Sequence, residues 1–419
     1  MKYVIIGNSA AAIGAVEGIR QADKQGEILI ITNEPYHTYS RPLISYYFSK
    51  EKIKTSVKAG DLKLPHTENN SANTAFGGSP MKYRPADFYK DNNCELIHST
   101  AVQIEPKKKK VMLADYSLVP YDRLLVATGS SPFTPPQFEN LEKKHNFITL
   151  DDAIKLEKSI TENSRVLIIG AGLIGLKCAE GILKRVASVT VADIAPRILP
   201  AVLEDESAKI LQSHLEEKGI VFKLSTEVNN FDEYDIVVVA AGVRPNVELL
   251  RGIAEIGKGI LINEKSETTA PDIYAAGDCT ESLDVSSGEI KIMALLPNAY
   301  IQGEAAGVNM AGRDEPKVFD KAIPMNAVGF FGLHVITAGN YNGEVYTANT
   351  NKDYKKLFYS DNKLNGYILI GNIEKAGIYT SLIREKTPLD TIDFKLICEK
   401  PGLMAFTKEE RLIKLEGVS

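Results

Sequence analysis

The sequence predicts an α/β protein with two Rossmann-like dinucleotide-binding domains and a C-terminal α+β domain. Two stretches support this fold class, because residues 3–12 and 166–175 each run from an apolar strand through a turn of small residues into a helix. Their first glycines, Gly7 and Gly170, are 163 positions apart. Small residues let the backbone approach a pyrophosphate, whose charge is stabilised by the N–H groups at the start of the helix. Two such turns predict two bound dinucleotides, with electron transfer between them.

The first turn departs from the G-x-G-x-x-G pattern, since Ser9 and Ala12 stand where glycines are usual. Both side chains are small enough for a phosphate to approach, and a second strand at 28–32 ends shortly before Glu34. A serine-hydrolase nucleophile elbow is the alternative for this strand, turn and helix. An elbow serine follows an inner strand that other strands precede, whereas Ser9 follows the first strand. We therefore expect a dinucleotide here.

The second turn, 170–175, matches G-x-G-x-x-G in full. A helix at 173–185 and a strand at 188–192 follow it, and the strand ends at Asp193. An acid at this place accepts both ribose hydroxyls of an adenosine and repels a 2′-phosphate. A purely structural glycine turn is the alternative. The pattern predicts a nucleotide site that prefers NADH to NADPH, although Arg197 nearby weakens that preference.

Composition excludes several classes. The net charge of −5 gives no indication of nucleic-acid binding, and no apolar run approaches the roughly 18 to 20 residues that span a bilayer. Because the first strand begins at Tyr3, no room is left for a cleavable signal segment, and we expect a cytoplasmic protein. The cysteines, Cys94, Cys178, Cys279 and Cys398, are far apart in sequence. This spacing argues against a disulfide framework, a metal site and a dithiol relay.

An internal repeat reinforces the two-domain interpretation. Each nucleotide unit closes with an apolar strand that enters a small-residue turn, at 121–129 and again at 234–242. A buried strand at 272–278 then ends in Gly-Asp, and a helix of small residues is expected at 298–311. The C-terminal region adds a hairpin at 354–371 and a helix near 373–384.

This order of motifs over residues 1 to about 312 resembles the flavin-dependent pyridine nucleotide oxidoreductases, the superfamily that contains glutathione reductase. The resemblance implies that the first turn holds FAD and the second holds NADH. It also implies a discontinuous FAD-binding domain at 1–114 and 237–320, with a loop insertion at 58–80. The NAD(H)-binding domain is then expected at 115–236 and the C-terminal α+β domain at 321–419.

The resemblance also assigns roles to single residues of this sequence. At FAD it implies Gly7, Ser9, Ala10 and Ala11 at the pyrophosphate, Glu34 at the adenosine ribose, Arg41 and Pro42 near the diphosphate, and Val102 at the adenine through its backbone. It further implies Ala127, Thr128 and Gly129 beside the cofactor, Gly277 and Asp278 at the ribityl chain, and the helix start at Pro297 directed at the flavin pyrimidine. At NADH it implies Gly170, Gly172, Leu173, Ile174 and Gly175 at the pyrophosphate, Asp193 at the ribose, and Gly242 in the matching turn. An ordinary surface arginine is the alternative for Arg41, and a loop or capping acid is the alternative for Asp278.

The Arg41-Pro42 segment resembles that of NADH:rubredoxin oxidoreductases and of the N-terminal half of the nitrite reductase large subunit. The paired cysteines of disulfide reductases are absent, and Tyr46 stands where peroxide-handling NADH oxidases have their cysteine. Members of this branch often have a lysine at the position of Tyr46 and a glutamate at that of Lys177. We hypothesise that Lys177 lies near the nicotinamide and stabilises an anionic reduced flavin. A helix lysine that extends into solvent is the alternative.

The function that the resemblance implies is an FAD-dependent NAD(P)H oxidoreductase. It would take a hydride from NADH and pass electrons to a small redox protein such as rubredoxin or ferredoxin, or to a downstream redox centre. One alternative is a flavin NADH oxidase that reduces O2. Another is a flavin-dependent scaffold that resembles the apoptosis-inducing flavoproteins. We expect no bound metal, no nucleic acid and no membrane, and a monomer or homodimer.

Overall fold

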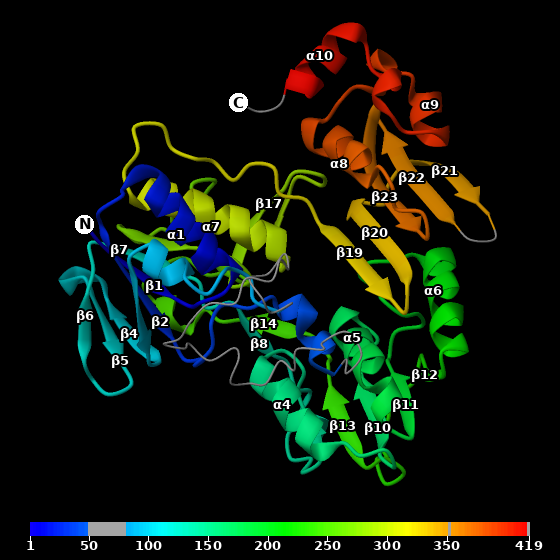
Figure 1. Ribbon diagram of the computed structural model, residues 1–419, viewed down its shortest axis with the longest axis horizontal. Coiled ribbons are helices and arrows are strands. Elements are labelled where there is room, and N and C mark those ends of the chain that lie inside the picture. The colour runs from blue at the N-terminus through cyan, green and yellow to red at the C-terminus, as the bar shows by residue number, and fades with distance from the viewer. Residues whose placement is uncertain (49–80, 351–352, 417–419) are drawn as a thin grey trace. The chain divides into compact units, whose positions relative to one another are not determined.

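The structure is a computed structural model that describes residues 1–48, 81–350 and 353–416. The chain divides into two units (Figure 1). The first unit comprises Met1–Ile198, Gly219–Ser282 and Ile290–Asp320, and the second comprises Leu199–Lys218, Leu283–Glu289 and Lys321–Ser419. The insertion expected at 58–80 lies outside the described residues. Among the described residues, no helix has both the length and the apolar character needed to cross a bilayer.

The first unit begins with a parallel sheet of strand order β16-β7-β1-β2-β3. These strands are β1 (Lys2–Ile6), β2 (Glu27–Thr32), β3 (Cys94–His98), β7 (Arg123–Val126) and β16 (Ile273–Ala275). Alternate side chains of the central β1 point to opposite faces. On one face Tyr3 and Ile5 pack with helices α1 (Ala10–Ala22) and α7 (Leu296–Met310). On the other face Val4 and Ile6 pack with β4 (Ala101–Glu105), β5 (Lys110–Leu113) and β6 (Leu118–Pro120). We call this sheet with its covering elements the first module.

Helices α1 and α7 cross at very short distance, and they lie side by side in Figure 1. A methyl group at Gly14 of α1 would lie 2.1 Å from the carbonyl oxygen of Tyr300. A methyl group at Gly303 of α7 would lie 1.9 Å from the carbonyl oxygen of Ala11. Only glycine permits these approaches, because real Cβ atoms do not come within 3 Å of such an oxygen. The small residues of both helices therefore fix the position of α7 against α1.

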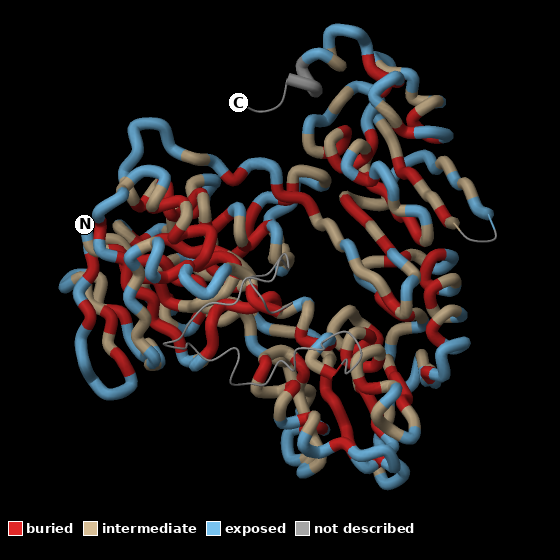
Figure 2. Tube along the Cα trace, viewed as in Figure 1, coloured by how far each residue is buried: buried red, intermediate tan, exposed pale blue. Residues whose placement is uncertain are grey.

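The second sheet, of order β12-β11-β10-β13-β9, is also parallel. Its strands are β9 (Lys144–His145), β10 (Arg165–Ile169), β11 (Ser188–Ala192), β12 (Ile220–Lys223) and β13 (Ile236–Val239). The sheet and its helices α4 (Leu150–Ser159) and α5 (Leu173–Ile182) are called the second module. The helix expected at 173–185 leaves α geometry after Ile182 and ends as the 3₁₀ turn η4 (Leu183–Arg185). Figure 2 shows the central strands of both sheets, such as β1 and β10, as mostly buried.

The domain boundaries expected at 114/115 and 236/237 are wrong. Strand β7 lies beyond the first boundary and pairs with β1 in the first sheet. Strand β13 starts at the second boundary and pairs with β10 in the second sheet. Each boundary therefore separates a closing strand from the sheet to which it hydrogen-bonds. The segment 199–218, expected in the NAD(H)-binding domain, belongs to the second unit.

Two short strands connect the modules. Strand β8 (Ser130–Pro132) follows β7, and β14 (Val243–Pro245) follows β13. The two strands pair in an antiparallel ladder that joins Ser130 to Pro245 and Pro132 to Val243. Further small elements of this part include η1 (Arg41–Phe48), α3 (Phe88–Asp91), β15 (Ile260–Leu261), β17 (Thr280–Asp284) and β18 (Glu289–Lys291).

The second unit confirms the expected α+β architecture. Its antiparallel sheet has the order β19-β20-β23-β22-β21. The elements are β19 (Met325–Phe330), β20 (Leu333–Gly339), β21 (Glu344–Asn349), β22 (Tyr354–Ser360), β23 (Lys363–Ile370), α6 (Asp205–Glu217), α8 (Ala376–Glu385), α9 (Phe394–Glu399) and α10 (Lys408–Glu416). Its core joins Tyr367 and Leu369 of β23 to Tyr379 and Leu382 of α8. The expected hairpin is β22 and β23.

Candidate active site

The first glycine turn is formed at the carboxyl end of β1. Gly7 has φ +116°, and a methyl group there would lie 2.1 Å from the carbonyl oxygen of Ala127. The Gly7 N–H donates to the Ile31 carbonyl at 2.8 Å, and the Ala127 N–H donates to the Ile6 carbonyl at 2.8 Å. The turn is thus held between the ends of β2 and β7. Only glycine fits here, both because of the positive φ and because of the close oxygen.

The helix that follows has a free place for an anion at its start. Ser9 is the N-cap of α1 with extended backbone angles, and its side chain makes no capping bond within the described chain. Ala10 and Ala11 begin the helix, and both are small and buried. By contrast, α4 begins with a complete capping box in which the Thr149 and Asp152 side chains satisfy the helix N–H groups. The start of α1 therefore suits the pyrophosphate of a dinucleotide.

The second glycine turn repeats this geometry at the end of β10. Gly170 has φ +111°, and a methyl group there would lie 2.3 Å from the carbonyl oxygen of Ala240. A methyl group at Gly175 would lie 2.0 Å from the Gly170 carbonyl oxygen, so the helix packs directly on its own turn. Gly172, the N-cap of α5, differs from both because a methyl group there would meet no described atom within 4 Å. The turn is therefore open at Gly172, next to the half-buried Leu173 and Ile174, and this open side would admit a phosphate.

Asp193 lies beside this second turn, as expected for a ribose-binding acid. Its carboxylate accepts the Ala171 N–H at 2.7 Å and the Ala195 N–H at 2.8 Å. The acid that ends the second strand is therefore fixed against the glycine turn itself. A carboxylate at the end of this strand would disfavour a 2′-phosphate.

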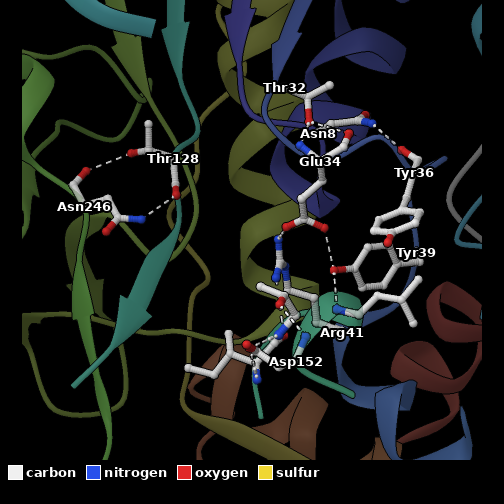
Figure 3. A network of polar contacts seen from close by, with 12 residues as sticks. Asn8, Thr32, Glu34, Tyr36, Tyr39, Arg41, Thr128, Asp152 and Asn246 are labelled. Atoms are coloured by element: carbon white, nitrogen blue, oxygen red, sulfur yellow. Dashed lines mark hydrogen bonds and ion pairs between the residues drawn. The ribbon is translucent and has the colours of Figure 1, made fainter. Parts of the chain in front are cut away.

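Glu34, the corresponding acid of the first module, has other partners. Its carboxylate accepts from the Tyr39 hydroxyl at 2.6 Å and forms an ion pair of 2.5 Å with Arg41 (Figure 3). Burial raises the pKa of the Tyr39 hydroxyl above its usual range, so that this group stays protonated and donates. Arg41 also donates to the Ile148 carbonyl at 3.3 Å, and the Tyr39 oxygen accepts the Leu150 N–H at 3.1 Å. Arg41 is thus part of a network, whereas its neighbour Pro42 is exposed.

Asp278 follows β16 and lies at the edge of the sheet where the parallel strands end, as the first turn does. Burial raises the pKa of the Asp278 carboxyl, and the charge of Arg41 and a hydrogen bond from Ser130 lower it in part. Gly277 has φ +87°, and its N–H donates to the side-chain oxygen of Gln302 at 2.5 Å. Gln302 was not anticipated from the sequence; it is 3% exposed and comes from α7. The small-residue pattern of α7 predicted the helix but gave no signal for this glutamine.

The turn after β7 is held by a second unanticipated residue, Asn246. Thr128 donates through its hydroxyl to the Asn246 carbonyl at 2.8 Å, and the Asn246 amide donates back to the Thr128 carbonyl at 2.9 Å (Figure 3). The Asn246 N–H donates to the Gly129 carbonyl at 3.0 Å. Gly242, in the matching turn after β13, has φ +113°, and its carbonyl accepts the Phe133 N–H at 2.9 Å. The ends of the two closing strands are therefore tied together.

Lys177 contacts Tyr46, the position with which the sequence paired it. Its ammonium group lies 5.4 Å from the Tyr46 ring centroid and forms an ion pair with Glu180 one turn along α5. Only 16% of the Lys177 side chain is exposed, so the alternative of a lysine extended into solvent is wrong. The sequence spacing of Lys177 and Glu180 could have revealed this pair.

Val102 and Pro297 are the two remaining expected contacts. Val102 is 49% exposed and lies where the register of β4 against β5 shifts, so it is skipped in the pairing of Ala101 with Leu113 and Gln103 with Met112. A bulge of this kind redirects the backbone. Pro297 lies in the first turn of α7, which begins at Leu296.

Thiol and metal chemistry have no visible basis in the described part of the chain. All four cysteines are described and free. Burial raises the pKa of Cys94 to about 12 and, together with smaller charge effects, that of Cys398 to about 11, and it also raises the pKa values of Cys178 and Cys279. Because the thiolate is the reactive form, none of them is activated as a nucleophile. Within the described ranges, no three His, Cys, Asp or Glu side chains group as metal ligands.

Comparisons with known proteins agree with this geometry. The pyridine nucleotide-disulphide oxidoreductase family matches residues 1–303, and the rubredoxin NAD+ reductase C-terminal domain matches residues 324–387. The epsilon subunit of an NADH-dependent phenylglyoxylate dehydrogenase from Aromatoleum evansii is 30% identical over 94% of each chain. An NADH oxidase from Methanocaldococcus jannaschii is 33% identical over 74% of this chain and 70% of its own. A crystal structure of a covalent putidaredoxin reductase–putidaredoxin complex has the same fold, with a TM-score of 0.82 and 20% identity over 100% of this chain and 99% of the other.

Proposed function

The chain belongs to the pyridine nucleotide-disulphide oxidoreductase family, and we propose that it carries electrons from NADH through FAD to a small redox protein or to a redox centre in a partner subunit. It is an oxidoreductase whose family uses FAD and NADH. The observation that carries the proposal is the duplicated turn, with Gly7 against Ala127 and Gly170 against Ala240, in a chain whose four cysteines are free.

When bound, FAD accepts a hydride and releases electrons singly; the residues of the chain hold and orient it. In this proposal the start of α1 at Ser9, Ala10 and Ala11 binds the FAD pyrophosphate through backbone N–H groups. Asp278 is directed at the ribityl chain, where a hydroxyl would satisfy its buried carboxyl. The bulge at Val102 supplies backbone contacts to the adenine. The α7 start at Pro297 presents its positive end to the flavin.

The second module would hold NADH at Gly170, Gly172 and Gly175, with Asp193 at the adenosine ribose. Its carboxylate is already fixed by two backbone N–H groups, so it presents a constant negative charge to the nucleotide. This arrangement favours NADH over NADPH. We further propose that Lys177, neutralised by Glu180 and packed on Tyr46, lies near the nicotinamide.

The electron acceptor is proposed from two of the matches. The match to a rubredoxin reductase C-terminal domain at 324–387 favours a small carrier protein. The likeness to a dehydrogenase subunit favours a redox centre in a partner protein. We also propose a cytoplasmic location and a monomer or homodimer.

A second candidate is an NADH oxidase that delivers electrons to O2, which the likeness to the archaeal NADH oxidase favours. An acceptor panel separates the two. The FAD-loaded protein is reduced with NADH without oxygen and then mixed with rubredoxin, ferredoxin or air-saturated buffer. Faster reoxidation by a carrier protein supports the proposal, and faster reoxidation by O2 supports the oxidase. Failure of NADH to reduce the flavin would contradict both.

A further inference from the structure

We propose that Tyr39 and Asn246 are paired positioning residues that together fix the first module against the second. The inference rests on the proposed function, because its consequence is the placement of the two nucleotide turns relative to each other. Each residue lies at one of two separate polar junctions, which Figure 3 shows apart from one another. We call them the Tyr39 junction (Glu34, Tyr39 and Arg41 with Ile148 and Leu150) and the Asn246 junction (Thr128, Gly129 and Ser131 with Asn246).

The Tyr39 junction joins the end of β2 to the start of α4. Tyr39 is 6% exposed. Its hydroxyl donates a hydrogen bond to the Glu34 carboxylate at 2.6 Å and accepts one from the Leu150 N–H at 3.1 Å. Glu34 and Tyr39 belong to the first module, whereas Leu150 is the first residue of α4 in the second module. Removing this hydroxyl breaks the direct route from the Glu34 carboxylate to the second module and leaves Arg41 as its remaining link.

The Asn246 junction joins the ends of the two closing strands. Besides its backbone bonds to Thr128 and Gly129, Asn246 donates from its side chain to the Thr128 carbonyl at 2.9 Å and accepts the Ser131 hydroxyl at 2.7 Å. Thr128 follows β7 of the first sheet, and Asn246 follows β14, which continues from β13 of the second sheet. The only ladder between these connections spans three residue pairs in the described chain. A ribbon that short can twist, so side-chain bonds are needed to hold its angle.

Two separated junctions restrain an angle that one alone leaves free. If either is lost, the other, the ladder and the packing of η1 against α4 and α5 still limit the motion. If both are lost, the ladder and that packing remain, together with the Tyr36 bond to Asp151. The losses are therefore expected to be more than multiplicative, as for residues that share one geometric task. The affected quantity is the distance between the sites at Gly7 and Gly170, and a misplacement of about 1 Å can slow a reaction by about 100-fold.

The test is a double-mutant cycle of Tyr39→Phe and Asn246→Ala in the FAD-loaded protein. The rate constant of flavin reduction by NADH is measured without oxygen, and amide hydrogen exchange at 130–133 and 243–246 is measured without NADH. We expect the rate constant of flavin reduction to fall by about 3- to 10-fold in each single variant. In the double variant it should fall by more than the product of these two factors, on the order of 100-fold or more. Exchange should be fastest in the double variant.

Two matched controls lie within the first module. Tyr3→Phe removes a hydroxyl bond to Asp23 at 2.9 Å, and Asn309→Ala removes amide bonds to the Lys265 and Lys317 carbonyls at 2.9 and 2.8 Å. The control pair is expected to lower thermal stability and to leave the reduction rate within about 2-fold. A strictly multiplicative junction pair, or controls that slow reduction equally, would overturn the inference. If NADH fails to reduce the parent protein, the proposed function fails instead.

Discussion

The two glycine turns of this molecule are nearly identical in backbone and differ in what their acids do. Gly7 and Gly170 have φ values of +116° and +111°, and each lies against the carbonyl of a closing strand. Asp193 is bound to its own turn through the Ala171 N–H, whereas Glu34 is bound to Tyr39 and Arg41. One acid is thus bonded to its own turn, and the other takes part in the contact between the modules. A repeated motif does not imply a repeated role for each residue in it.

The helices that follow the two turns also differ, in the part of the chain against which each one packs. Helix α5 packs on its own turn through Gly175, whose place in the first turn is taken by Ala12. Helix α1 packs on α7 through Gly14 and other small residues. The first site is therefore completed by a distant segment of the chain, while the second is completed locally. This difference makes the second site easier to recognise from sequence.

The largest expected effect comes from Gly7→Ala and Gly170→Ala. Each adds a methyl group 2.1 to 2.3 Å from a carbonyl oxygen at a positive φ. We expect a loss of about 2 to 5 kcal/mol in the free energy of unfolding, from backbone strain and overpacking together. Urea denaturation measures this loss. The affinities of each variant for FAD and for NADH then show which of the two sites the substitution damages. Loss of the same ligand in both variants would contradict the assignment of the turns.

Gly172→Ala separates binding from stability. Gly172 has φ −79° and no described atom near its Cβ position, so alanine fits the fold. Stability should stay within about 0.5 kcal/mol of the parent protein, while NADH affinity falls because the methyl group occupies the side of the turn open to a phosphate. Calorimetric titration with NADH measures the affinity. Unchanged affinity would place the pyrophosphate elsewhere.

Asp193→Asn and Glu34→Gln compare the two acids directly. Hydrogen bonds to a charged group contribute about 1.5 kcal/mol or more, so Asp193→Asn should weaken NADH binding by about 10-fold and improve the relative use of NADPH. Glu34→Gln should leave NADH affinity unchanged and lower FAD retention. The two dissociation constants measure both effects. An equal loss of NADH affinity in both variants would remove the distinction between the acids.

Lys177→Glu reverses the charge that contacts Tyr46. Two acids, the new Glu and Glu180, would then face one another on α5, and like charges at this spacing destabilise a helix by only a few tenths of a kcal/mol. We therefore expect a small change in stability together with slower flavin reduction and a lower flavin potential. Spectroelectrochemistry and stopped-flow absorbance measure these quantities. Values equal to those of the parent protein would remove Lys177 from the site.

The smallest expected effect is the change in stability that Asp278→Asn causes in the FAD-free protein. Because burial raises its folded-state pKa, the folded state holds this proton more tightly than the unfolded state, and stability is lost as pH rises from about 4 through the raised pKa. Asp278→Asn should therefore stabilise the FAD-free protein near neutral pH and lose that advantage below about pH 4. Thermal unfolding across this pH range measures it. A destabilised variant at neutral pH would contradict the raised pKa of this carboxyl.

The sequence predicted what local patterns determine and missed what depends on distant pairing. Gly7, Gly170 and Asp193 follow from strand–turn–helix spacing, so both sheets and the α+β unit could be anticipated. The boundaries at 114/115 and 236/237 were wrong because the sheet to which β7 or β13 belongs is decided by hydrogen bonds to β1 or β10. Tyr39 and Asn246 had no local signal for their role between the modules, since Leu150 and Thr128 are more than 100 residues away from them in sequence.

The central claim is that NADH reduces a flavin that no thiol pair accompanies. An anaerobic titration of the FAD-loaded protein with NADH, followed by flavin absorbance, tests this claim most directly. The account predicts complete reduction after a single equivalent of NADH per FAD, because the four cysteines are free and none is activated. Uptake of a second equivalent would require another two-electron centre in the chain and would contradict the account.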